Sequence, residues 1–230
     1  MKRPFDPRAV VFDLDGTLLD SLTLVLQAIE HALEPYGSRP TRDIFAQLGG
    51  PPERFLPLLL PDRKHLRAAI ERMESYHRAN MHLIRPFAGA VPLLERLRSE
   101  GRRIAIWTGR DRASAILLLH EHRLAEYFGA VICGDDLPSH KPDPEGLHEV
   151  MRQLGVCAAE TLFVGDADVD VLGGAACGVN TLLIRHDRAI EPAISARSWR
   201  TVASPTEAFE TVLGCLGSGG ASRAAAPTGV

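Results

Sequence analysis

Short apolar runs rich in β-branched residues recur along this chain, and such runs are typical of buried strands. They lie at residues 9–12, 103–107, 130–133, 161–164 and 179–184. Amphipathic patterns that predict helices lie at residues 90–99, 113–121, 145–154 and 169–177. Because strands that alternate with helices form right-handed crossovers, the expected fold class is α/β, with a Rossmann-like parallel sheet covered by helices on both faces.

The first predicted strand is followed by a stretch, residues 18–89, that is too long for a loop. Its apolar periodicity predicts helices at residues 22–33, 42–48 and 62–84. We therefore expect an α/β core formed by residues 1–18 and 87–216, with a helical domain, residues 19–86, inserted after the first strand. Pro86 and Gly89 are the expected hinge points of this domain. Residues 217–230 are rich in Gly, Ala and Ser, which predicts a disordered tail.

The composition of the chain excludes several classes of partner. Of its 230 residues, 45% are hydrophobic and 24% charged, as in globular proteins with a sizeable core. A net charge of -3 gives no basic field for nucleic acid, and no apolar stretch reaches membrane-spanning length. Four widely spaced cysteines without a CxxC pair indicate reduced thiols. We expect a cytoplasmic monomer or homodimer with a small-molecule partner.

Two acids one residue apart, Asp13 and Asp15, end the first predicted strand. Such like charges repel unless a cation lies between them. Ligands of open parallel sheets bind at the carboxyl ends of the strands, so residues that follow the other strands are expected to join these acids. The residues at that edge are Thr17, Thr108, Gly109, Arg110, Lys141, Asp166 and Asp170. This set suits a divalent cation together with a phosphoryl group.

Four short motifs in this order resemble those of the haloacid dehalogenase superfamily. They are FDLDGT from Phe12, WTGR from Trp107, SHKPDPE from Ser139 and GDADVD from Gly165. The helical insertion resembles the helical cap of that superfamily. The stretches FDLDGTLLDS and QLGGPPERFL resemble phosphoglycolate phosphatases in particular. The resemblance implies a Mg²⁺-dependent phosphatase that hydrolyses a small-molecule phosphate ester through an aspartyl-phosphate.

The resemblance also implies roles for individual residues, and the chemistry of those residues agrees with it. A carboxylate such as Asp13 is a competent nucleophile toward phosphorus, and Asp15 can protonate the leaving group. Thr108 and Lys141 complete the catalytic set. The implied metal ligands are Asp13, Asp15 through its backbone carbonyl, Asp166 and Asp170, and oxygen is the ligand that Mg²⁺ prefers. The implied phosphate and substrate contacts are Thr17, Gly109, Arg110, Gly50 and Arg54, of which Gly50 and Arg54 belong to a predicted loop of the cap.

Several alternatives remain open at this point. Asp20, Ser21 and Asp168 lie at helix starts, and the bland interpretation is that they cap these helices. A sugar phosphomutase resembling β-phosphoglucomutase is disfavoured, because Val25 and Ile29 stand where such enzymes carry His and Trp. A pyrophosphatase of the same family and a noncatalytic metal- or phosphate-sensing protein are further alternatives. Phosphoglycolate, a sugar phosphate and a phosphorylated secondary metabolite are all candidate substrates.

Overall fold

The structure, a computed structural model, describes residues 5–40 and 51–216. A six-stranded sheet in the order β5-β4-β1-β6-β7-β8 forms its centre, and every neighbouring pair is parallel. The strands are β1 (Ala9–Phe12), β4 (Arg103–Trp107), β5 (Ala130–Ile132), β6 (Thr161–Gly165), β7 (Asn180–Ile184) and β8 (Arg200–Val202). The α/β fold class expected from the sequence is confirmed.

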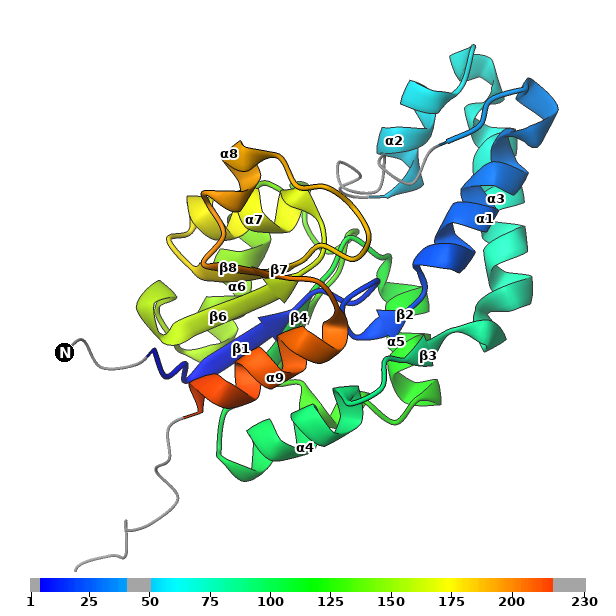
Figure 1. Ribbon diagram of the computed structural model, residues 1–230. Helices are drawn as coiled ribbons and strands as arrows, with labels where there is room; N and C mark the ends of the chain where they lie inside the picture. Colours follow the sequence, from blue (N-terminus) through cyan, green and yellow to red (C-terminus); the bar gives the residue numbers. More distant parts are fainter. Residues whose placement is uncertain (1–4, 41–50, 217–230) are drawn as a thin grey trace, which may run out of the picture.

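Helices cover both faces of the sheet (Figure 1). One face carries α4 (Ala90–Ser99), α5 (Arg112–Glu121) and α9 (Pro205–Cys215), and the other carries α6 (Glu145–Leu154), α7 (Asp168–Ala176) and α8 (Pro192–Ser195). Successive strand residues point to opposite faces, so Val10 and Phe12 of β1 join one apolar cluster while Val11 joins the other. Central strands buried on both sides read as continuous apolar runs for this reason.

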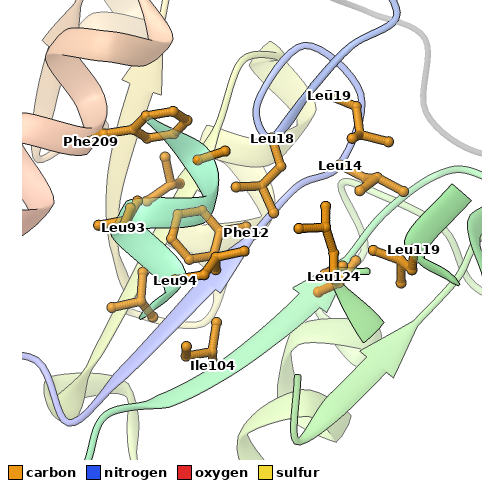
Figure 2. Packing of buried hydrophobic residues seen from close by; sticks show 14 of the residues in the cluster. Phe12, Leu14, Leu18, Leu19, Leu93, Leu94, Ile104, Leu119, Leu124 and Phe209 are labelled. Carbon is orange, nitrogen blue, oxygen red and sulfur yellow. The ribbon is translucent and has the colours of Figure 1, made fainter. Parts of the chain in front are cut away.

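The cluster beneath α4, α5 and α9 fixes the carboxyl end of β1. Figure 2 shows Phe12 of β1 among side chains from three other segments. They include Leu18 from the loop after β1, Leu94 from α4 and Phe209 from α9. Phe12, Leu18 and Leu94 are fully buried. Burying one such side chain stabilises a fold by about 1.5–3 kcal/mol. The residue that follows Phe12 therefore starts from a rigid position.

The inserted segment has helices of its own, α1 (Leu22–Leu33), α2 (Pro52–Leu59) and α3 (Leu66–Asn80). These helices lie beyond the edge of the sheet in Figure 1 and share a separate apolar cluster that includes Ile29, Phe55 and Ala69. The segment leaves the core through β2 (Leu19–Asp20) and returns through β3 (Arg85–Pro86), and these two short strands pair antiparallel. Both crossings therefore lie side by side.

Most element bounds agree with the sequence prediction within one residue, and the differences have local causes. The pattern at residues 62–84 resolves into α3 with the 3-10 turns η3 (Arg63–His65) and η4 (Met81–Leu83) at its ends. The predicted loop that contains Arg54 is wrong in part, because α2 begins at Pro52, and proline fits the first turn of a helix. The predicted helix at 42–48 and the tail at 217–230 lie outside the described residues.

All four cysteines of the chain are free thiols. Within the two described segments, no helix combines the length and the apolar character needed to cross a bilayer.

Candidate active site

Three acids from different parts of the chain meet at the carboxyl edge of the sheet. Asp13 follows β1, and its N–H donates to the carbonyl of Val164 on β6 at 2.8 Å. Asp166 follows β6 and Asp170 lies in the first turn of α7. All three are buried, and one carboxylate oxygen of each lies within 4.8 Å of the others. The strand order β4-β1-β6 produces this meeting, because β1 and β6 are neighbours.

Lys141 pairs with two of these acids. Its Nζ lies 2.7 Å from Oδ1 of Asp13 and 2.7 Å from Oδ1 of Asp170, and the residue is 6% exposed. The same Nζ lies 4.9 Å from the ring centre of Trp107 and 5.2 Å from that of Phe163. Burial lowers the pKa of Lys141, but the two carboxylates outweigh it and hold the pKa above its ordinary value. Lys141 therefore stays charged.

Both carboxylate oxygens of Asp170 accept hydrogen bonds from their surroundings. Its Oδ2 accepts the N–H groups of Asp166 and Ala167 at 3.1 and 3.0 Å, while Oδ1 accepts Lys141. The carboxylate also packs against Gly165, where a Cβ would lie 2.4 Å from Oδ2. Asp170 thus holds the loop that carries Asp166 and the ammonium group of Lys141 in fixed positions.

The cluster carries an excess of negative charge that a divalent cation would balance. Burial raises the pKa of Asp13 to about 7, against the effect of Lys141. Burial, together with the charge of Asp13, raises the pKa of Asp166 well above its usual range. Three acids against one lysine, with oxygen donors on every acid, fit Mg²⁺ by charge and by ligand type.

Asp15 faces a different set of partners. Its Oδ2 accepts Nε of Arg110 at 2.8 Å, and its Oδ1 accepts Nη2 of Arg110 at 2.5 Å and the hydroxyl of Ser21 at 2.5 Å. Burial would raise the pKa of Asp15, but Arg110 outweighs it and holds that pKa below its ordinary value. The carboxylate of Asp15 is therefore separate from the three-acid cluster, and the metal contact through its backbone carbonyl stays a prediction.

Ser21 corrects one interpretation of the sequence. It precedes α1 as a capping residue would, yet its side chain makes no capping hydrogen bond and its hydroxyl donates to Asp15 instead. Asp168, the first residue of α7, likewise pairs with Arg188, with Nη1 and Oδ1 2.9 Å apart. Both residues thus hold parts of the site.

Arg110 also contacts the inserted helices. Its Nη1 lies 3.2 Å from Nε2 of His77 on α3, and its side chain is 6% exposed. The sequence prediction gave Arg110 a substrate contact, and the structure shows it between Asp15 and His77.

Thr108 and Gly109 follow β4 and continue the edge. The N–H of Thr108 donates to the carbonyl of Ile132 at 3.0 Å, and its hydroxyl oxygen accepts the N–H of Arg110 at 3.2 Å. Thr108, Gly109 and Lys141 line one small cavity. The contact of these residues with a phosphoryl group stays a prediction.

Thr17 contacts the three-acid cluster, because its buried hydroxyl donates to Oδ1 of Asp166 at 3.4 Å. The neighbouring Gly16 has φ +74°, and a Cβ there would lie 2.5 Å from Oδ2 of Asp166. Only glycine suits this close approach. The predicted phosphate contact of Thr17 stays a prediction.

The predicted cap contacts do not join this network. Arg54 is exposed on α2 and takes no part in the hydrogen bonds described above. Gly50 lies outside the described residues.

Two residues of the site, His186 and Arg188, escaped the sequence analysis. Nε2 of His186 lies 2.8 Å from the carbonyl oxygen of Gly16, and because a carbonyl only accepts, this nitrogen carries the proton. Nη2 of Arg188 donates to the carbonyl of Asp166 at 2.6 Å. Both residues follow β7 at the same sheet edge, so the rule that located the other residues could have indicated them.

A family model for haloacid dehalogenase-like hydrolases matches residues 10–184 of this chain. The chain belongs to the haloacid dehalogenase-like hydrolase family. This hydrolase is 35% identical to phosphoglycolate phosphatase 1 of Pseudomonas aeruginosa over 197 residues, which cover 78% of this chain and 70% of that protein. It is 32% identical to pyrophosphatase PpaX of Halalkalibacterium halodurans over 184 residues, which cover 77% and 83%.

Solved structures agree with this assignment. A haloacid dehalogenase-like hydrolase from Bacteroides fragilis matches with a TM-score of 0.75 at 27% identity, covering 86% of this hydrolase and 98% of that chain. A hydrolase from Pseudomonas syringae matches with a TM-score of 0.75 at 22% identity, covering 90% and 98%, and shows the same fold. The superfamily and the resemblance to phosphoglycolate phosphatases expected from the motifs are confirmed.

Proposed function

We propose that this hydrolase is a Mg²⁺-dependent phosphatase that cleaves a small-molecule phosphate monoester through an aspartyl-phosphate on Asp13. The observation that carries the proposal is the carboxylate of Asp13 at the edge of the sheet, 2.7 Å from the ammonium group of Lys141 and beside two further acids. The relatives named as phosphatases support the same conclusion.

The first half of the reaction uses Asp13 and Asp15. A carboxylate oxygen of Asp13 forms a bond to phosphorus while the bond from phosphorus to the ester oxygen breaks. Asp15 must be protonated for this step, although Arg110 favours its carboxylate form, and it gives that proton to the leaving oxygen. Such proton transfer contributes roughly 10²- to 10⁴-fold. The N–H of Gly109, the hydroxyl of Thr108 and the ammonium group of Lys141 stabilise the charge on the phosphoryl oxygens.

The second half returns Asp13 to its free form. Asp15, now a carboxylate, takes a proton from a water molecule that attacks phosphorus, and the bond from Asp13 to phosphorus breaks to release inorganic phosphate. Asp13, Asp166 and the backbone carbonyl of Asp15 would hold Mg²⁺, which neutralises charge on the transferred group when bound. Asp170 and Arg188 keep the loop of Asp166 in place.

The helices between the two crossings act, in this proposal, as a cap that selects the substrate. Residues 19–86 form the cap, and residues 1–18 and 87–216 form the catalytic core. The antiparallel pair β2-β3 joins the cap to the core at a single place, which suits a hinge. The core handles only the phosphoryl group, so groups on the cap side decide which ester enters.

Phosphoglycolate is the first substrate to test, because several relatives carry that name, and pyrophosphate is the second for the same reason. A sugar phosphate and a phosphorylated secondary metabolite complete the panel. A cytoplasmic location, the choice between monomer and homodimer, and the lack of nucleic-acid or membrane partners stay predictions.

Release of inorganic phosphate by the purified protein tests the proposal. We expect release from p-nitrophenyl phosphate and from at least one ester of the panel with Mg²⁺, and loss of release with a chelator. Asp13→Asn, purified in parallel, controls for contaminating phosphatases. A phosphomutase would instead return the phosphoryl group to the sugar, and binding of Mg²⁺ without any turnover would indicate a sensing protein.

A further inference from the structure

Arg110 connects the acid of the core to a helix of the inserted segment. Its guanidinium group forms a bidentate salt bridge with Asp15 through Nε and Nη2, and its remaining Nη1 contacts His77 on α3. The side chain is 6% exposed, so these contacts are shielded from solvent. A bidentate salt bridge fixes the orientation of a carboxylate and also stabilises its ionised form.

The contact with His77 has a defined polarity. A guanidinium group only donates, so Nε2 of His77 must accept, and the proton of the ring lies on Nδ1. Burial, followed by the charge of Arg110, lowers the pKa of His77 to about 4. His77 is therefore a neutral acceptor that holds the third nitrogen of the guanidinium group.

The pattern of contacts leaves one carboxylate atom of Asp15 available for chemistry. Oδ1 accepts both Ser21 and Arg110, which uses its two lone pairs. Oδ2 accepts Arg110 alone among the described residues. An ionised carboxylate has about four such positions in all, so the free one lies on Oδ2.

We propose that Arg110 and His77 are positioning residues that aim Oδ2 of Asp15 at the leaving oxygen, and that α3 supplies this aim by contacting Arg110. The proposal rests on the proposed function, because it assigns Oδ2 as the atom that gives and later takes the proton. When α3 lies against Arg110, the guanidinium plane is fixed at both ends and so is Asp15. When α3 moves away, Arg110 keeps its pair with Asp15 but loses the contact that fixes its orientation.

This arrangement joins substrate selection to chemistry through the fold. Arg110 follows Thr108 and Gly109 directly in sequence, so the group that orients the acid is attached to the loop proposed to bind the phosphoryl group. A substrate that lets α3 settle against Arg110 is processed with the acid aligned. One that holds α3 away meets a misaligned acid, and esters with poor leaving groups suffer most because their departure needs the proton.

Variants of His77 test the proposal most directly. His77→Leu removes the acceptor and His77→Gln retains one, while Ser75→Leu on the exposed face of the same helix is the matched control. The substrates are p-nitrophenyl phosphate, whose leaving group departs without a proton, and an alkyl phosphate such as phosphoglycolate. We expect His77→Leu to lower kcat/KM for the alkyl ester on the order of tenfold and kcat/KM for p-nitrophenyl phosphate by less than about threefold. The ratio kcat/KM is compared because it covers the steps through cleavage of the ester bond and not the later attack of water, which both substrates share. His77→Gln should recover most of the loss, and Ser75→Leu should match the wild type.

Variants of Arg110 show whether His77 acts through it. Arg110→Met should lower kcat/KM for the alkyl ester on the order of a hundredfold. Arg112→Met is its control, because Arg112 pairs with Asp136 instead. The double variant of His77→Leu and Arg110→Met should be no slower than Arg110→Met alone, since residues that act in series are not additive. Equal losses of kcat/KM for both substrates in His77→Leu, or additive losses in the double variant, would overturn the proposal.

A third measurement separates this proposal from the proposed function. If the wild-type protein with Mg²⁺ releases phosphate from none of the esters, the same single and double variants are compared by denaturant unfolding. Coupled effects on unfolding would then keep the contact between His77 and Arg110 but reject its role in catalysis, whereas additive effects would reject the contact as well.

Discussion

Lys141 and Asp13 form a buried ion pair, with Nζ and Oδ1 2.7 Å apart, although 127 residues separate them in the chain. The pair exists because the loop after β5 and the end of β1 reach the same edge of the sheet. Asp170 completes it from α7. The ammonium group of Lys141 therefore links three segments that lie far apart in the sequence.

Replacing Lys141 by Met should remove turnover and lower the free energy of unfolding by about 3–5 kcal/mol, because two buried carboxylates lose their cation. Lys64→Met is the control. Lys64 pairs with Asp62 at the surface, and such exposed pairs contribute about 0–1 kcal/mol. Denaturant unfolding measures both variants. Equal losses for the two lysines would show that the buried pair has no special role in stability.

Asp13→Asn should abolish phosphate release while leaving the far-ultraviolet circular dichroism spectrum and the cooperative thermal transition in place. The amide has nearly the same shape as the carboxylate, but it is a poor nucleophile toward phosphorus. Steady-state kinetics with p-nitrophenyl phosphate and acid-quench trapping of phosphoenzyme provide the measurements. Near-normal turnover in a preparation free of wild-type enzyme would refute the role of Asp13.

Gly165→Ala should be destabilising by roughly 1–3 kcal/mol and should weaken Mg²⁺ binding, because the added Cβ would lie 2.4 Å from Oδ2 of Asp170. Gly214→Ala provides a matched control in α9, where a Cβ meets no atom within 4 Å. Alanine in that helix should instead stabilise by about 0.5–1 kcal/mol. Thermal unfolding and calorimetric Mg²⁺ titration test both. Unchanged Mg²⁺ affinity in Gly165→Ala would show that Asp170 does not position the loop that carries Asp166 for metal binding.

The stabilisation by Mg²⁺ should increase as pH rises. Burial raises the pKa of Asp13 to about 7 from 3.8, and the pKa of Asp166 well above 3.8, so the metal-free folded protein binds more protons than the unfolded chain in this window. The contribution of these two groups to stability therefore falls as pH rises from about 4 to about 7. Mg²⁺ binds the deprotonated carboxylates, so it offsets this loss.

Melting temperatures with and without saturating Mg²⁺ check this expectation. The increase in Tm caused by Mg²⁺ should be larger at about pH 8 than at about pH 5.5. Asp166→Asn, which removes one raised carboxyl group, should reduce that difference. A Tm increase that is larger at the lower pH would mean that Asp13 and Asp166 do not bind the metal.

Most of the central sheet could be predicted because its strands are buried on both faces. The run at β1 ends where Asp13 begins, and its predicted and observed bounds are identical. The sequence prediction does not contain the edge strand β8 or the helices α8 and α9. β8 begins with the exposed Arg200 and is only half-buried, so it carries no continuous apolar run. α2 was missed because the adjacent Pro51 and Pro52 are typical of loops.

The residues of the candidate site could be predicted to gather, because each follows a parallel strand. Their pairing could not. Ser21 lies where a capping residue would lie, and no local pattern indicates that its hydroxyl donates to Asp15 instead. The contact of Arg110 with His77 joins two elements that no local pattern relates. Sequence periodicity indicates which face a residue lies on, and it carries no information about which partner shares that face.

The pairing of β2 with β3 has a consequence for how such an enzyme can change. Leu19 lies opposite Pro86 and Asp20 opposite Arg85, so the chain departs from the scaffold and rejoins it at one spot. The segment between those two strands can be replaced by another without any change in the six-stranded sheet. A graft of foreign helices between these strands would alter which molecules reach Asp13, and it would preserve the phosphorus chemistry only if the new helices offered Arg110 an acceptor in place of His77.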